Sequence, residues 1–316
     1  MATRATTLVQ QPRVAAPQQS LSRRFRRNLP GYLFILPWLI GFVVFTMGPF
    51  IASLYLSFTD WRILGTPNWV GFDNYRRILT TDQLFRITLK NTVYYAIFHV
   101  IAINVVSLAL AQLLNQKLRG FVLFRTLFYL PTVTSGVATA LVFSLMFNGN
   151  TGLINAALRL VGIKGPNWLF SETWTMPALI TISIWDLGVP MLIYLAALQN
   201  VPIELNEAAM IDGANRWQRF RNVLLPLISP TIFFNVMVSV IGSFKVFTLA
   251  KVITEGGPAN STLFYVLYLY RQAFESLRMG YATALGWILF LIIFALSGIQ
   301  ILASRRWVYY ESGDNV

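Results

Sequence analysis

Few side chains in this sequence could carry out chemistry. The chain has no cysteine and a single histidine, His99, which excludes thiol catalysis, disulfides, zinc–thiolate sites and multi-histidine metal sites. No Gly-x-Ser-x-Gly motif marks an activated serine. Because His99 has no acidic neighbour at helical spacing, we expect it to be packed and neutral. We therefore predict no catalytic residue, no metal site and no cofactor.

The chain also lacks the means to hydrolyse ATP. A phosphate-binding loop needs the pattern Gly-x-x-x-x-Gly-Lys-[Ser/Thr], and none of the five lysines follows a glycine. Any ATP-driven work must therefore be supplied by another polypeptide, and the chain is predicted not to be an enzyme.

Two charges, Asp186 and Lys245, interrupt long apolar runs. A charge near the centre of a bilayer costs at least about 2.5–3.5 kcal/mol, so each should face protein or water. They could form a structural pair, snorkel from near the interface, or line a substrate path.

Polar and aromatic groups near these charges are suited to a sugar. Trp185 precedes Asp186 and a Gly188-x-Pro190 break; an aromatic face can pack against a sugar ring while a carboxylate accepts hydroxyl protons. Residues spaced four apart share one helix face. A second group of polar residues has this spacing: Asn235, Ser239 and Ser243. These residues could line the path, or they could form hydrogen bonds between helices.

The elements that carry these residues must lie in a membrane. The sequence is 56% hydrophobic and 12% charged, with a mean hydropathy of +0.58, whereas a soluble domain carries roughly 25% charged residues. The net charge of +13 sits in short clusters between neutral runs, so it does not indicate a nucleic-acid-binding protein. The composition indicates an all-α integral membrane protein.

Six segments are long and apolar enough to span a bilayer, which takes about 20 residues each. The first is too long for the apolar core of a signal peptide, so we expect it to be retained. The apolar stretch Leu263–Tyr270 is too short and should be interfacial or packed on the protein. The six predicted spans are Tyr32–Leu56, Asn91–Gln116, Phe124–Phe147, Thr173–Ile203, Asn222–Ala250 and Met279–Ser304.

The placement of Lys and Arg predicts the orientation. Fourteen of these 25 residues fall on one side together with both termini, ten fall on the other, and Lys245 lies in the membrane. The clusters Arg23–Arg27 and Arg305–Arg306 flank the first and last spans. By the positive-inside rule both termini are cytoplasmic. The predicted organisation is a disordered cytoplasmic tail over 1–30, a membrane domain over 31–305 and a cytoplasmic tail over 306–316.

The loops on the outer side, residues 60–90 and 148–175, are rich in aromatic residues such as Trp61, Trp69 and Trp168. Trp and Tyr suit the membrane interface. They either anchor the chain there or contact an external partner.

One inner loop, residues 200–230, is far longer than the 2–8 residues that a helix connection needs, so it should have its own structure. Pro202 can open a helix, Leu205, Ala208 and Ala209 form an apolar stripe, and Gly213 can end the helix. A second helical segment follows. The pair of short amphipathic helices could rest on lipid headgroups or dock onto a cytoplasmic partner.

This loop resembles a known motif. Glu207-Ala208-Ala209, Asp212-Gly213-Ala214, Phe220, Leu225-Pro226 and Pro230 match the EAA loop of permeases from binding-protein-dependent ABC importers. Three further segments resemble the sugar branch of that family, the maltose and glycerol-phosphate type, although Phe72 replaces a usual Leu and Glu255 a frequent Gly. They are Gly71–Tyr75, Phe124–Pro131 and Thr254–Thr262.

The resemblance implies a type I ABC importer permease fold with six transmembrane helices. It implies that residues Glu204–Ile211 form a coupling helix in a groove of an ATPase subunit, so that ATP-driven closure switches the membrane cavity. It favours a sugar path for Trp185, Ser239 and Ser243. The residues that we expect to couple to the ATPase are Glu204, Glu207, Ala208, Ala209, Asp212 and Gly213.

The leading prediction is the permease subunit of an ATP-driven importer in a prokaryotic cell membrane, translocating a carbohydrate, polyol or glycerol phosphate. The implied partners are a second permease, two ATP-binding subunits and an external solute-binding protein. Two other classes stay open: an ion-coupled secondary transporter that uses Asp186 and Lys245, and a membrane enzyme.

Overall fold

The computed structural model describes residues 21–116 and 120–309. It divides the chain into two compact units, Met1–Ser53 and Leu54–Val316, each of which is described by itself.

The described part of the first unit is helical. Helix α1 (Leu21–Phe42) continues through the π-helical turn η1 (Val43–Met47) into α2 (Gly48–Ser57), whose end belongs to the second unit. The apolar run Leu29–Ser57 is long enough to cross a membrane and contains the first predicted span. The predicted disorder of residues 1–30 is wrong for residues 21–30, because a helix that has nucleated in the apolar run gains a hydrogen bond for each residue added. Residues 1–20 of that predicted tail lie outside the described residues, as do residues 310–316 of the other.

The second unit begins with a small antiparallel pair in which Thr59 faces Trp69 and Asp60 faces Asn68. Its remaining elements are helices and short helical turns. In chain order the elements are β1 (Thr59–Asp60), β2 (Asn68–Trp69), α3 (Asp73–Thr80), α4 (Gln83–Leu114), α5 (Phe121–Tyr129), η2 (Leu130–Val133), α6 (Gly136–Met146), α7 (Leu153–Leu160), α8 (Thr175–Ser183), η3 (Ile184–Asp186), α9 (Gly188–Gln199), α10 (Ile203–Ile211), α11 (Arg216–Arg219), η4 (Phe220–Leu224), α12 (Leu225–Leu227), α13 (Ser229–Phe244), η5 (Ala250–Thr254), α14 (Tyr265–Tyr270), η6 (Arg271–Glu275) and α15 (Met279–Ser304).

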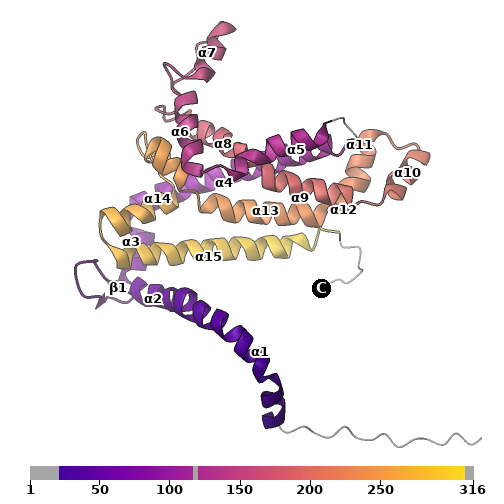
Figure 1. Ribbon diagram of the computed structural model, residues 1–316. Coiled ribbons are helices and arrows are strands. Elements are labelled where there is room, and N and C mark those ends of the chain that lie inside the picture. Colours follow the sequence, from indigo (N-terminus) through magenta and orange to yellow (C-terminus); the bar gives the residue numbers. More distant parts are fainter. Residues whose placement is uncertain (1–20, 117–119, 310–316) are drawn as a thin grey trace, which may run out of the picture. The chain divides into compact units, whose positions relative to one another are not determined.

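Helix α4 is the longest element and the centre of this unit. It starts at the cap residue Asp82, whose carboxylate accepts a hydrogen bond from the backbone N–H of Phe85 at 2.9 Å. Helices α9 and α13 both pack against α4, and α13 also packs against α15 (Figure 1). The long helices therefore form a bundle around α4.

Among the helices that the structure describes in this unit, α4 and α15 alone are unbroken and long enough to cross a membrane. Three further pairs are apolar enough together but are bent: α5–η2 against α6 by 101°, α8–η3 against α9 by 52°, and α11–α12 against α13 by 69°. With the first unit, the described residues hold three unbroken candidate spans, or up to six if each bent pair is one span.

The predicted span Phe124–Phe147 is thus not one continuous helix. Pro131 lies in η2, and Thr134 and Ser135 adopt extended backbone angles before α6 begins. Pro190 and Pro230 lie at the starts of the helices that follow the other two bends. A proline removes a backbone donor and crowds the preceding turn, so each bend falls where the helical hydrogen-bond ladder is already interrupted.

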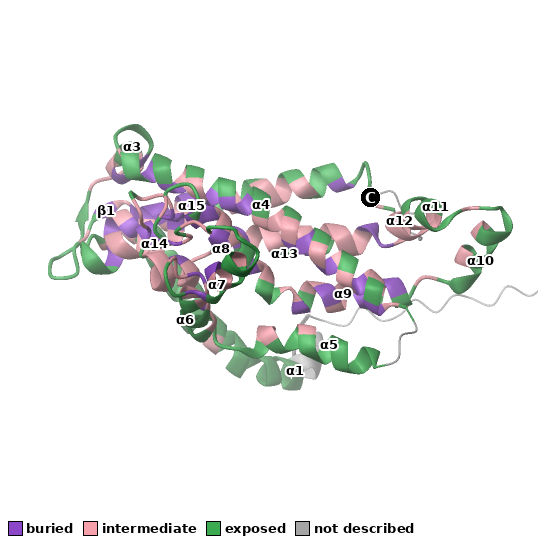
Figure 2. Ribbon diagram, turned by 90° about the horizontal axis from the view of Figure 1, so that it is seen from above, coloured by how far each residue is buried: buried purple, intermediate pink, exposed green. Residues whose placement is uncertain are grey.

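Burial is concentrated at one end of the bundle, where α8, α14 and α15 meet the start of α4 (Figure 2). The short helix α14 lies in this core: Phe264, Tyr265 and Leu267 are completely buried. This confirms that the stretch Leu263–Tyr270 packs on the protein. A second, smaller core joins the other end of α4 to α9 through Ala111, Leu114 and neighbouring side chains.

Gly188 is required where α9 begins. A Cβ atom added there would lie 2.7 Å from Thr132 Cγ2 and 2.8 Å from the carbonyl oxygen of Phe128. The segment α5–η2 therefore approaches α9 more closely than any other residue would allow.

We predict that Gly188→Ala destabilises the protein by about 1–3 kcal/mol, because an extra atom in a close-packed contact forces the backbone apart. The measurement is unfolding of the purified protein in detergent. Gly242→Ala is the matched control, since a Cβ at this helical glycine meets nothing within 4 Å. Equal stability of the Gly188 variant and the control would show that the contact is looser than described.

Candidate functional site

The 200–230 loop forms helical segments on either side of Gly213. Helix α10 follows its cap residue Pro202, and Gly213, at φ +80°, separates it from α11. The N–H of Gly213 donates to the carbonyl of Met210 at 3.1 Å, and the N–H of Ala214 donates to that of Ala209 at 2.9 Å. These bonds close the end of α10 and need a residue with positive φ at 213.

The second half of the loop is held by a capping box. Asn215 accepts a bond from the N–H of Gln218 at 2.9 Å, and the Gln218 side chain accepts one from the N–H of Asn215 at 2.8 Å. Arg219 then donates through Nη1 to Asn206 at 3.3 Å, which joins α11 to α10. A cavity of about 300 Å³ lies between this pair and the end of α4, where Gln112 and Gln116 line it.

Helix α10 buries none of its residues within the chain. Leu205 and Ala208 are exposed and Ala209 is half-buried, so the predicted apolar stripe is left uncovered. Ile211 is 87% exposed and Trp217 is 64% exposed. Large apolar side chains gathered on one exposed loop indicate an interaction surface.

The acidic residues of this loop point outward. Glu204 lies in the first turn of α10, Glu207 in its middle, and Asp212 at its C-terminal cap. All three are exposed, and none forms an ion pair within residues 21–116 and 120–309. They are accessible to a partner.

Trp185 and Asp186 lie together at the break between α8 and α9. Both are exposed, and the Trp185 ring contacts Phe143 of α6 edge-on, with 5.4 Å between centroids. Lys245 is also exposed, at the end of α13. In the described part of the chain no ion pair joins Asp186 to Lys245, so the structural-pair interpretation gains no support.

The three polar residues of α13 have different surroundings. Ser243 is buried and donates to the Val240 carbonyl of its own helix at 2.8 Å, while Asn235 is buried and donates to the Pro190 carbonyl of α9 at 3.4 Å. Ser239 is half-buried and donates to the Asn235 carbonyl at 2.7 Å. In this conformation Asn235 bonds helix to helix, as the alternative interpretation expected.

Two residues that the sequence analysis did not single out complete this arrangement. Asn104 of α4 donates to Ser239 Oγ at 3.2 Å and to the Val100 carbonyl at 2.8 Å, and it accepts a bond from the Tyr194 hydroxyl of α9 at 2.7 Å. An asparagine inside the charge-free run from 91 to 116 was the available signal. The network ties α4, α9 and α13 together.

His99 has a packing role in the structure. Its Nδ1 lies 2.7 Å from Ser183 Oγ, and its ring stacks on Tyr95 with 5.2 Å between centroids. Across the described ranges, no three His, Asp or Glu side chains gather into a group that could hold a metal ion.

Comparison with known proteins establishes the family. Residues 121–309 match the family described as "Binding-protein-dependent transport system inner membrane component", and the chain belongs to this family. It is 43% identical over 298 residues to the probable ABC transporter permease protein YesP of Bacillus subtilis, covering 93% of this chain and 96% of that protein. It is 36% identical over 301 residues to the lactose transport system permease protein LacF of Rhizobium radiobacter, covering 92% and 98%.

The fold agrees with this membership. One chain in the crystal structure of a bacterial ABC transporter involved in the import of the acidic polysaccharide alginate superposes with a TM-score of 0.80 and 26% identity, over 90% of this chain and 98% of that chain. A second structure of that transporter, with a TM-score of 0.80 and 25% identity, contains an alginate pentasaccharide-bound periplasmic protein.

The predicted class is therefore confirmed: the chain is a membrane permease component of an ABC importer that works with a solute-binding protein. Components of this family are not enzymes, and the ATPase is a separate subunit. The family membership does not support the alternative of an ion-coupled secondary transporter based on Asp186 and Lys245.

We predict that Tyr194→Phe destabilises the protein by about 1–3 kcal/mol, because it leaves the buried Asn104 oxygen without a donor. A double-mutant cycle with Asn104→Leu should show a coupling of about 0.5–3 kcal/mol, since the second change removes the acceptor that the first left unpaired. Denaturation in detergent measures all four corners. Purely additive effects would mean that the hydroxyl and the amide do not interact.

Proposed function

We propose that this chain is one permease subunit of an ATP-driven carbohydrate importer in a prokaryotic cell membrane, with six spans and both termini in the cytoplasm. Relatives named as lactose and arabinooligosaccharide permeases support the carbohydrate class. A second permease would pair with it, and an ATPase subunit would bind each permease.

Within this proposal, α10 is the helix that docks into the ATPase. The observation that carries the assignment is its isolation: α10 buries none of its residues in its own chain, yet its C-terminal end is fixed and its middle is tied to α11. The positive φ of Gly213 fixes one end, and the Arg219–Asn206 bond ties the helix to the rest of the loop. A helix with defined geometry and an uncovered surface can transmit movement of a bound partner to α13, because α13 follows directly after this loop.

The substrate path is proposed to pass the break between α8 and α9. A bent helix pair leaves backbone groups without helical partners, and such irregular backbone is tolerated at membrane depth where it lines protein or water. Trp185 and Asp186 lie at this break and are exposed. Asn235, Ser239 and Ser243 of α13 would come into the path only if the contact between α9 and α13 opens during the transport cycle.

We predict that Gly213→Pro and Ala209→Trp abolish uptake. Proline cannot adopt the φ of +80° found at 213. The indole of the Ala209 variant would overfill the ATPase groove that we propose for α10. The measurement is ATPase stimulation by the sugar-loaded binding protein in the complete reconstituted transporter, together with the amount of permease in the membrane.

Gly162→Pro is the matched control for the glycine variant. Gly162 also has a positive φ, of +77°, also ends a short helix, and its N–H also donates to a nearby carbonyl, that of Arg159 at 3.0 Å. It lies in the loop after α7 and not in the 200–230 loop. The docking assignment fails if the Gly213 and Ala209 variants keep normal stimulation.

Trp185→Ala should lower uptake roughly 2- to 10-fold, because an aromatic contact contributes about 0.5–1.5 kcal/mol. Association with the ATPase should not change, since the substitution is remote in sequence from the 200–230 loop. Phe143→Ala, which removes only the ring that packs against Trp185, separates loss of a sugar contact from loss of packing. Uptake kinetics identical to the parent would return Trp185 to a packing role.

A further inference from the structure

A polar pocket of about 320 Å³ opens at the end of α4 opposite the 200–230 loop. Asp82, at the start of α4, lines it, whereas Gln112, near the other end of α4, lines the cavity beside Asn206 and Arg219. The 32 residues of α4 rise about 48 Å, more than the roughly 30 Å of a bilayer core. The two ends of α4 therefore open on opposite sides of the membrane.

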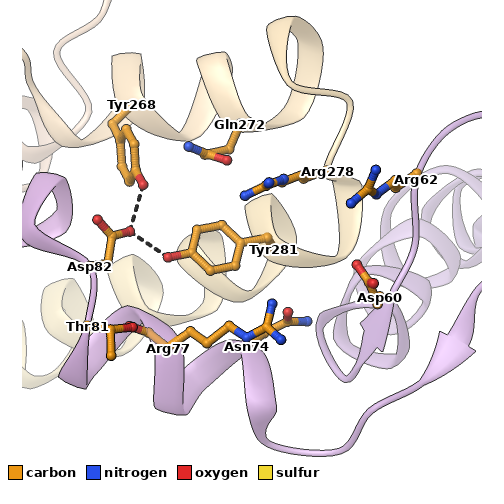
Figure 3. Close-up of a pocket in the computed structure, with 10 residues that line it drawn as sticks. All are labelled: Asp60, Arg62, Asn74, Arg77, Thr81, Asp82, Tyr268, Gln272, Arg278 and Tyr281. Atoms are coloured by element: carbon orange, nitrogen blue, oxygen red, sulfur yellow. Dashed lines mark hydrogen bonds between the residues drawn. The ribbon is translucent and has the colours of Figure 1, made fainter.

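One wall of the pocket is built by a fully engaged carboxylate. Asp82 Oδ2 accepts hydrogen bonds from the hydroxyls of Tyr268, at 2.6 Å, and Tyr281 (Figure 3), and Oδ1 accepts one from the N–H of Phe85. Burial raises the pKa of Tyr268, and its bond to Asp82 raises it further, so Tyr268 stays a donor. Asp82 thus joins α4, α14 and α15 and holds the pocket in shape.

The opposite wall presents two arginines. Arg62 and Arg278, whose side chains are drawn in Figure 3, are partners in an antiparallel backbone bridge. Beside this bridge, the N–H of Gly280 donates a hydrogen bond to the Trp61 carbonyl at 3.0 Å. Leu277, at φ +57°, makes the turn that sets Arg278 in place. A non-glycine residue in this conformation is strained, and such strain gathers at functional positions.

These two guanidinium groups have no acidic partner. Neither Arg62 nor Arg278 forms an ion pair in the part of the chain that the structure describes, whereas Arg77, on the same rim, pairs with Asp73 at 2.9 Å. Between them and Tyr268 lies Gln272, whose Oε1 is buried and has no hydrogen-bond partner. Two carboxylates, Asp60 and Asp82, also line the pocket, but among the described residues neither forms an ion pair with Arg62 or Arg278, and Asp82 already accepts three hydrogen bonds. The pocket therefore offers two unpaired guanidinium groups and one unpaired amide oxygen to a ligand.

We infer that this pocket receives an acidic side chain of the solute-binding protein when that protein docks. This inference rests on the proposed orientation, which puts the pocket on the outer side. An arginine fork binds a carboxylate through two parallel hydrogen bonds, and a backbone N–H beside that carboxylate can satisfy Gln272. Arg62 and Arg278 are exposed at the mouth, so a protein surface can reach them.

The position of the pocket favours the binding protein over the transported sugar as the source of the carboxylate. Its lining comes from the segment 60–82, from α14 with η6, and from the start of α15. None of it comes from α8, η3, α9 or α13. Trp185 and Asp186 lie in η3, and the other proposed path residues lie in α13. A volume of about 320 Å³ suits one side chain and lies at the lower limit of ligand pockets.

The test measures docking directly. The complete transporter is placed in lipid nanodiscs, and binding of its own solute-binding protein is measured in the sugar-free and the sugar-loaded form at two salt concentrations. The double variant Arg62→Gln, Arg278→Gln should weaken binding of both forms roughly 10-fold or more and reduce its salt dependence. Arg76→Gln is the matched control, since this exposed arginine lies on α3 beside Arg77 but does not line the pocket.

A charge-reversal pair tests the same contact by rescue. Arg278→Glu should abolish docking, and replacing one acidic residue on the docking face of the binding protein by Arg should restore it. The unfolding midpoint of each variant transporter is measured in parallel, so that restored docking reports charge pairing and not refolding.

Three results would overturn the inference. The inference is wrong if the double variant binds the solute-binding protein as tightly as the Arg76 control does. In that case the proposed function still stands, provided that the double variant supports uptake and Gly213→Pro does not. A loss confined to the binding protein loaded with an acidic sugar, with sugar-free docking unchanged, assigns the carboxylate to the substrate. No docking to the parent transporter would refute the proposed function itself.

Discussion

The need to satisfy polar groups where water is absent shapes this molecule. A bilayer offers no hydrogen bonds to the backbone, so spanning segments become helices and each polar side chain between them must find a partner. Helix α4 meets this need for the second unit. Asn104, near its middle, bonds to Tyr194 of α9 and Ser239 of α13, and Thr92 accepts a bond from the N–H of Tyr265 just as α14 begins.

The same helix connects the two surfaces to which we assign different tasks. At one end, Asp82 is the helix cap and also the acceptor that holds Tyr268 and Tyr281 in the arginine-rimmed pocket. At the other end, Gln112 faces the 200–230 loop across a small cavity. An importer must pass information between a binding protein outside and an ATPase inside, and a single straight helix is a stiff element between the two.

The broken helices complement this stiffness. The pairs α5–α6 and α8–α9 bend at prolines, and the contact at Gly188 brings the first pair against the second. Bends at fixed places allow one part of a bundle to move relative to another without melting a helix. Trp185 and Asp186 lie at one of these bends, where we propose that the substrate path passes.

The sequence by itself determined the class of protein and the most informative loop. Apolar runs of spanning length required a membrane protein, and Glu207 to Pro230 carried the family resemblance that the comparisons confirmed. The helix–glycine–helix form of the 200–230 loop was also predictable, because Pro202 and Gly213 act on the local backbone alone.

Only the tertiary structure decided where side chains meet. Phe124–Phe147 reads as one apolar span, but a 101° bend divides it, since an apolar composition does not show whether the ladder of a helix is continuous through Pro131. Asn104 stood out only as an asparagine in a charge-free run, and its partners became clear only once α9 and α13 were packed against it. The pocket of Arg62, Asp82 and Arg278 joins residues that are more than 200 positions apart. No local pattern encodes such a pairing, because it depends on how helices pack.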